Sequence, residues 1–244
     1  MAQQDIALDL TQFEFCVPFY ADLITQHHLV NHFNLGTFSP KSLSNWHLPT
    51  VFTYFKAHPL WQHYYDLARD YAIKALLQGL DYFPELDRKL MQRFLIEAHL
   101  YLSDHNFIQQ VHDKIAALIQ PKQPTLIIAH SLGSVIAYNL LRQHPEYQIH
   151  SLISLASPLA FKMIQTKIVH PIQRPACLLG DWLNFYSVDD FLSASPLNQK
   201  PFAFQPAIHN QAIHTHLANP HQLQDYLQHP LVLNSLKKIL KDFA

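Results

Sequence analysis

The chain has 244 residues, which suits one α/β domain, and 49% of them are hydrophobic against 14% charged. This composition excludes a disordered chain. Seventeen basic and eighteen acidic residues give a formal net charge of -1, so the charge balance gives no indication of nucleic-acid binding. Apolar runs stay shorter than the roughly 18 residues of a membrane span, and residues 1–10 lack the features of a signal peptide. With only two cysteines, Cys16 and Cys177, we expect a cytoplasmic protein.

The N-terminal half is predicted to be mostly helical. Residues 13–17 indicate a short buried strand closed by Pro18, and residues 31–50 are rich in loop formers. Apolar side chains then recur at helical spacing, which predicts helices over 61–79, over 84–98, and from a cap at Asp104 to before Pro121. We interpret residues of about 50–120 as a helical insertion, acting as a lid, within a single domain spanning 1–244.

The second half alternates between strand and helix signals. Residues 125–129 (TLIIA) form a continuous apolar run that is typical of a strand buried on both faces. Residues 132–142 have the pattern of a helix. Further strands are predicted at 151–156, at 182–186 and in part of 204–217. This alternation predicts the α/β class, with a mostly parallel sheet covered by helices on both faces.

Between the first of these strands and its helix stands the segment AHSLGS, residues 129–134. A serine on such a sharp strand-to-helix turn is the arrangement of a nucleophile elbow. Ser131 is therefore the candidate nucleophile, and the N–H of Leu132 is the candidate donor to an oxyanion. Small residues, here Ala129 and Gly133, are expected where strand and helix approach closely. The alternative is a serine that only caps the helix.

Several segments together resemble the α/β-hydrolases, specifically a group of bacterial serine hydrolases of the esterase and lipase type. They are FYADLI at 19–24, AHSLGSVIAY at 129–138, ASPL at 156–159, WLNFYSVDD at 182–190 and HQLQDYLQHP at 221–230. The resemblance runs from about residue 13 to the C-terminus. It implies a catalytic Ser-His-Asp triad that needs no cofactor and no metal.

The acid of the triad is expected after the strand at 182–186, because the family places an aspartate in that loop. Asp190 matches the family position by its spacing from Trp182 and Asn184, and Asp189 is the reserve candidate. A shift of one residue in an extended chain reverses the direction of the side chain, so only one of the two aspartates is expected to face the site.

The base has several candidates, since five histidines follow the aspartates: His209, His214, His216, His221 and His229. In the family the histidine precedes the last helix, with an apolar residue two positions later and a Tyr-Leu pair at five and six. His221 matches this pattern with Leu223, Tyr226 and Leu227. We therefore assign His221 as the general base, while His214 and His216 are expected in the preceding strand.

One family feature is missing. The family opens with a strand ending in His-Gly, whose loop supplies a second oxyanion donor, and this chain has no His-Gly dipeptide. The fold is therefore expected to be N-terminally shortened, with Leu132 as the only visible oxyanion donor. Two functions stay open: a hydrolase of carboxylic esters or related acyl compounds, including lipids, or an impaired homologue that acts as a binding module. The sequence does not determine the oligomeric state.

One pair of histidines has the spacing of metal ligands. His28 and His32 are four residues apart and could share a helix face. Because no carboxylate completes a metal-binding motif there, the sequence predicts no metal.

Overall fold

The structure is a computed structural model that describes residues 10–20, 22–23, 97–98, 100–190, 192–193, 195–216 and 219–243. The chain separates into two compact units, Met1–Tyr20 with Leu100–Ala244 and Ala21–His99. All elements named below belong to the first unit. The helices predicted over 61–79 and 84–98, apart from helical residues 97 and 98, lie outside the described residues, as does the His28 and His32 pair. The lid and the single-domain organisation stay predictions.

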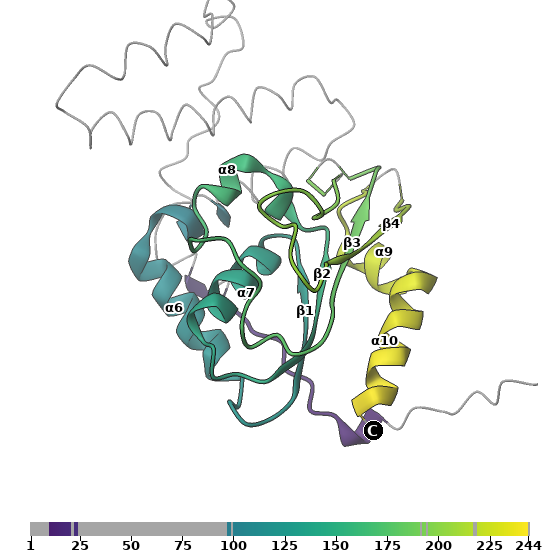
Figure 1. Cartoon of the computed structure of the whole chain (residues 1–244), viewed down its shortest axis with the longest axis horizontal. Helices are drawn as coiled ribbons and strands as arrows, with labels where there is room; N and C mark the ends of the chain where they lie inside the picture. The colour runs from purple at the N-terminus through teal and green to yellow at the C-terminus, as the bar shows by residue number, and fades with distance from the viewer. Residues whose placement is uncertain are drawn as a thin grey trace, which may run out of the picture. The chain divides into compact units, whose positions relative to one another are not determined.

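In the part of the chain that the structure describes, four strands form one parallel sheet in the order β1-β2-β3-β4 (Figure 1). They span Thr125–His130 (β1), Ile149–Leu155 (β2), Trp182–Ser187 (β3) and His209–Ile213 (β4). Each predicted strand of the second half is therefore present, and the predicted α/β class with a parallel sheet is confirmed. In such sheets, ligand sites gather beyond the carboxyl ends of the strands.

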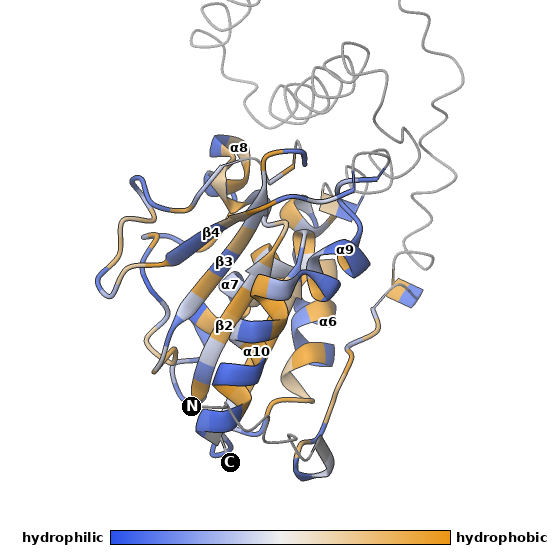
Figure 2. Cartoon of the chain, turned by 90° about the vertical axis from the view of Figure 1, so that its right-hand side faces the viewer, coloured by the Kyte–Doolittle hydropathy of each residue, from blue (hydrophilic) through white to orange (hydrophobic). Residues whose placement is uncertain are grey.

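Helices cover both faces of this sheet (Figures 1 and 2). On one face lies α7 (Leu132–Gln143), with α6 (His105–Ala116) beside it. The other face is covered by α10 (Pro230–Phe243), which follows the short α9 (Leu223–Gln228). Between β2 and β3 the chain forms a 3-10 turn, Pro158–Ala160, and the short α8 (Lys162–Gln165). Asp104 caps α6 as predicted, by accepting a hydrogen bond from the Phe107 N–H.

Two hydrophobic cores fix the layers. Under α9 and α10, a buried cluster joins strand residues to the helices: Ile153, Leu155, Phe185, Ile213, Tyr226, Val232 and Ile239. On the opposite face, the fully buried Trp182 lies 6.1 Å from the ring of Tyr138 of α7 and 6.3 Å from that of Phe202. Since adjacent residues of a strand point to opposite faces, the apolar runs of β2 and β3 supply both cores.

A row of polar side chains, buried at Ser154 and Asn184 and half-buried at Asn210, crosses the sheet beside the second core. Ser154, Asn184 and Asn210 are register partners on β2, β3 and β4. Ser154 Oγ donates to Asn184 Oδ1 at 2.8 Å, and Asn184 Nδ2 donates to Asn210 Oδ1 at 2.9 Å. Ser154 Oγ also accepts a hydrogen bond from Trp182 Nε1. Buried polar groups paired in this way fix the register of neighbouring strands.

Residues 13–17 correct one prediction, because they form no strand. Residues 14–20 have no regular secondary structure, and Phe15 and Val17 are exposed. A strand needs a neighbouring strand to accept its hydrogen bonds. Among the described residues, β1 pairs only with β2, so its outer edge is open there, and residues 13–17 do not pair with it.

Two smaller predictions also differ from the structure. The helix expected to run to Pro121 ends at Ala116, which leaves Leu118 exposed. The strand expected to contain His214 and His216 ends at Ile213, so both histidines follow it.

No helix among the described residues has the length and hydropathy to cross a membrane. Cys16 and Cys177 are both free thiols. No group of three or more metal-ligating side chains was found in the part of the chain that the structure describes.

Candidate active site

Ser131 lies on a strained turn between β1 and α7. Its backbone has φ 52° and ψ -129°, in the left-handed half of conformational space that residues other than glycine rarely adopt. Its N–H donates to the Leu155 carbonyl oxygen of β2 at 2.9 Å. The turn therefore ends the strand abruptly and places the serine beyond the carboxyl end of the sheet.

A second serine braces this turn from the first turn of α7. Ser134 Oγ lies 2.6 Å from the Ser131 carbonyl oxygen and 2.7 Å from Ser157 Oγ, at the end of β2. The Ser134 N–H also donates to the Ser131 carbonyl, at 2.9 Å. These contacts hold the Ser131 backbone from both neighbouring elements, which is how a strained conformation persists.

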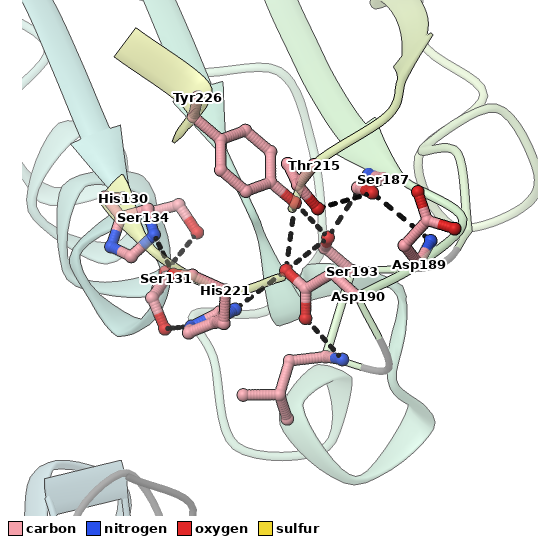
Figure 3. Close-up of polar contacts among 11 residues, drawn as sticks. His130, Ser131, Ser134, Ser187, Asp189, Asp190, Ser193, Thr215, His221 and Tyr226 are labelled. Carbon is pink, nitrogen blue, oxygen red and sulfur yellow. Dashed lines mark hydrogen bonds and ion pairs between the residues drawn. The ribbon is translucent and has the colours of Figure 1, made fainter. Parts of the chain in front are cut away.

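The side chain of Ser131 does not cap α7, which argues against the alternative of a simple helix cap. Instead, Ser131 Oγ lies 2.7 Å from His221 Nε2, and His221 Nδ1 lies 2.7 Å from Asp190 Oδ2 (Figure 3). A carboxylate can only accept, so the imidazole carries its proton on Nδ1. Nε2 then offers a lone pair to the serine hydroxyl.

Asp190, and not Asp189, faces the histidine. Asp190 follows β3, is 2% exposed, and accepts from the Leu192 N–H on Oδ1 at 3.0 Å. Asp189 points outward and pairs with His214 at 3.0 Å. The predicted alternation of side-chain direction between the two aspartates is thus observed. The structure brings together Ser131, His221 and Asp190, the three residues expected from the sequence.

Two hydroxyl groups at Asp190 were not anticipated from the sequence. Ser193 Oγ and Tyr226 Oη each lie 2.9 Å from Asp190 Oδ2, the oxygen that also bonds His221, and 2.8 Å from each other. Ser193 is in the loop after β3, and Tyr226 is on α9. Burial, and secondly the charge of Asp190, raise the pKa of the Tyr226 phenol, so this group keeps its proton and remains a donor.

His130 adds a third unanticipated contact. Its Nε2 lies 3.1 Å from the His221 carbonyl oxygen, so that nitrogen carries the proton and donates. The two imidazole rings lie 5.0 Å apart. Burial, and secondly the proximity of His221, lower the pKa of His130 to about 4. His130 is therefore neutral near pH 7 and holds the backbone of His221 from the last residue of β1.

The Leu132 N–H is in the position expected of an oxyanion donor. Leu132 is the first residue of α7, and the first N–H groups of a helix have no partner within it. The expectation that Gly133 must be small because strand and helix approach closely is wrong, because a Cβ built there meets no atom within 4 Å. Its small size is not required by contact between strand and helix, and it leaves open space beside the serine.

The other histidine candidates lie elsewhere. His209 is on β4 and lies 3.5 Å from Asp181, and His214 pairs with Asp189. His229 ends α9, where its Nδ1 accepts from the Leu231 N–H. The His216 N–H donates to Asp225.

Sequence signals for the unanticipated residues were weak. In the sequence, Tyr226 is part of the pattern around His221, which does not indicate a contact with Asp190. Nothing local distinguishes Ser193 or His130 from other polar residues. No model of a protein family, no curated protein and no solved structure matches this chain, so the functional argument rests on the geometry around Ser131.

Proposed function

We propose that this chain is a serine hydrolase of the α/β-hydrolase type that cleaves carboxylic esters or related acyl compounds. The observation that carries the proposal is the continuous hydrogen-bonded series from Ser131 Oγ through His221 to Asp190, with both distances at 2.7 Å. A strained serine joined to an imidazole that a buried carboxylate orients is the arrangement by which hydrolases activate a hydroxyl.

The first half-reaction forms an acyl-enzyme. Ser131 Oγ attacks the carbonyl carbon of the ester while His221 Nε2 accepts the hydroxyl proton. The carbonyl oxygen becomes an oxyanion, to which the Leu132 N–H donates at the positive end of α7. His221 then gives its proton to the leaving alkoxide, which departs as the alcohol.

The second half-reaction restores the serine. His221 Nε2 takes a proton from water, whose oxygen attacks the acyl carbon. The bond to Ser131 Oγ breaks, and the proton returns to that oxygen as the carboxylic acid leaves. Asp190 stays ionised and stabilises the imidazolium in both steps. None of these steps requires a metal or an organic cofactor.

A fluorophosphonate probe tests the proposal, because it reacts with activated serines. Wild-type protein should be labelled, and Ser131→Ala should abolish the label. Ser195→Ala is the matched control, since Ser195 is an exposed serine and its loss should change nothing. Asp190→Asn should lower the labelling rate by about 10⁴, as expected when the imidazole loses its orienting acid.

An unlabelled wild-type protein would overturn the proposal. It would favour the alternative, a homologue that uses the fold as a binding module. Hydrolysis of p-nitrophenyl acetate that disappears in Ser131→Ala would give independent support.

A further inference from the structure

Three side chains converge on a single oxygen of the candidate acid. Asp190 Oδ2 receives His221 Nδ1 at 2.7 Å, and Ser193 Oγ and Tyr226 Oη at 2.9 Å each. The other oxygen of the carboxylate takes the Leu192 N–H. Each of these groups that donates a proton to Asp190 stabilises the ionised form of a carboxyl group that is almost fully buried.

The two hydroxyl groups cannot act independently. They lie 2.8 Å from each other, and between them they have two protons for three short contacts. At least one hydroxyl therefore donates to Asp190 in every arrangement, because either both donate to it or one does so while the other donates to the first. Both arrangements satisfy the distances, because Ser193 and Tyr226 lie equally close to Asp190 Oδ2. The Ser187 N–H, 3.4 Å from Ser193 Oγ, supports the pair from the end of β3.

We propose that Ser193 and Tyr226 form a redundant pair of positioning residues, in which either hydroxyl alone can hold Asp190 ionised and aimed at His221. This inference rests on the proposed function, because it assigns the pair to the acid of that triad. If one hydroxyl is removed, the other is already within 2.9 Å of the same oxygen and donates to it directly. Only removal of both leaves Oδ2 with His221 alone.

The location of Tyr226 gives the pair a second role. It lies on α9, five residues after His221, whereas Asp190 follows β3. The segment that carries the base is thus joined to the acid twice, through the imidazole and through the phenol (Figure 3). Because the phenol is buried and its proton is retained at neutral pH, this second connection does not depend on pH in the working range.

The redundancy is tested by a double-mutant cycle with Ser193→Ala and Tyr226→Phe. The readout is the rate of labelling by a fluorophosphonate probe. Each single variant should lose less than about twofold, and the double variant about 10- to 100-fold, as expected for the loss of a hydrogen bond to a charged group. Losses that simply multiply, or no loss in the double variant, would overturn the proposal.

A merely structural role is separated from positioning by the pH profile. The titratable groups facing Asp190 are His221 and Tyr226, with His130 against the His221 ring and the Asp189–His214 pair on the outer side. The double variant lacks both hydroxyl donors that favour the ionised carboxylate, so the acid limb of its labelling profile should move to higher pH. An unchanged limb would contradict the proposal.

The control is Tyr138→Phe, which also removes a buried and hydrogen-bonded phenol, but one whose partner is the backbone of Gln173 and not a residue of the site. It should lower stability without moving the pH profile.

The low-field proton resonance of His221 Nδ1 gives a readout that needs no chemistry. It should persist in both single variants and weaken or exchange rapidly in the double variant. Its loss in either single variant would refute the redundancy, even where the double variant does not fold. If the probe does not label the wild-type protein but the resonance behaves as expected in the variants, only the hydrolase proposal is refuted. If the probe labels the wild-type protein but the resonance does not behave in this way, only the redundancy of Ser193 and Tyr226 is refuted.

Discussion

Replacing Ser131 tests whether its turn stores strain. The residue has φ 52° and ψ -129°, a conformation that costs a residue with a side chain about 1–3 kcal/mol. Ser131→Ala keeps this cost, whereas Ser131→Gly removes it. Glycine loses about 0.4–1 kcal/mol through the greater freedom of the unfolded chain. Both variants lose the hydrogen bond to His221 equally, so Ser131→Gly should be more stable than Ser131→Ala by about 1 kcal/mol.

Urea unfolding measures this difference directly, and thermal unfolding should show it as a shift of about 2–4 °C for a domain of this size. Ser235 within α10 is the matched control, because glycine in the interior of an ordinary helix is less stable than alanine by about 1 kcal/mol. The two sites should therefore respond with opposite signs. A Ser131→Gly variant that is no more stable than Ser131→Ala would refute the inference of strain.

Four other substitutions probe the scaffold by urea unfolding. The pKa of His130 is lowered from 6.5 to about 4, so the unfolded chain binds a proton before the folded chain does as pH falls. Up to about 2 kcal/mol of the free energy of unfolding should therefore be lost between pH 7.5 and pH 5. The His130→Gln variant should lose less over this range, and an equal loss would contradict the prediction. Asn184→Leu should cost about 2–3 kcal/mol, because it breaks the buried row at Ser154 and Asn210; a neutral result would show that the row is dispensable. Gly133→Ala should raise the free energy of unfolding by about 0.5–1 kcal/mol, since the new Cβ meets open space. Gly180→Ala should lower it by about 1–3 kcal/mol, since the new Cβ would lie 2.1 Å from the His150 carbonyl oxygen. The opposite order of stability would refute the contact geometry.

The predictable part of the fold was the part with local signals. The apolar run of β1, the turn at Ser131 and the helical pattern after it are continuous in sequence, so their arrangement could be inferred directly. Residues 13–17 have an equally apolar sequence, yet they form no strand. Strand formation requires that the segment lie alongside a neighbour with free backbone groups, and a short apolar run does not reveal whether the fold brings the two together.

The residues of the candidate site also differ in how far the sequence predicts them. Sequence spacing brought the choice of acid down to Asp190 or Asp189, but the direction of the chain after β3 decides which of them is buried. The supporting hydroxyls could not be inferred, because Tyr226 is 36 residues from Asp190 and the contact depends on how α9 packs. Ser193 is only three residues away, but a serine at that distance from an aspartate is common in loops.

The geometry of the site depends most on how His221 is held. The imidazole is bonded at both nitrogens, to Ser131 and to Asp190, and its backbone carbonyl accepts from His130. A misplacement of about 1 Å can cost 10²-fold in rate, while the loss of one such contact costs only about 1 kcal/mol in stability. Substitutions at His130 should therefore affect labelling of Ser131 more than folding. A large loss of labelling with a small loss of stability distinguishes a residue that positions the imidazole from one that only packs beside it.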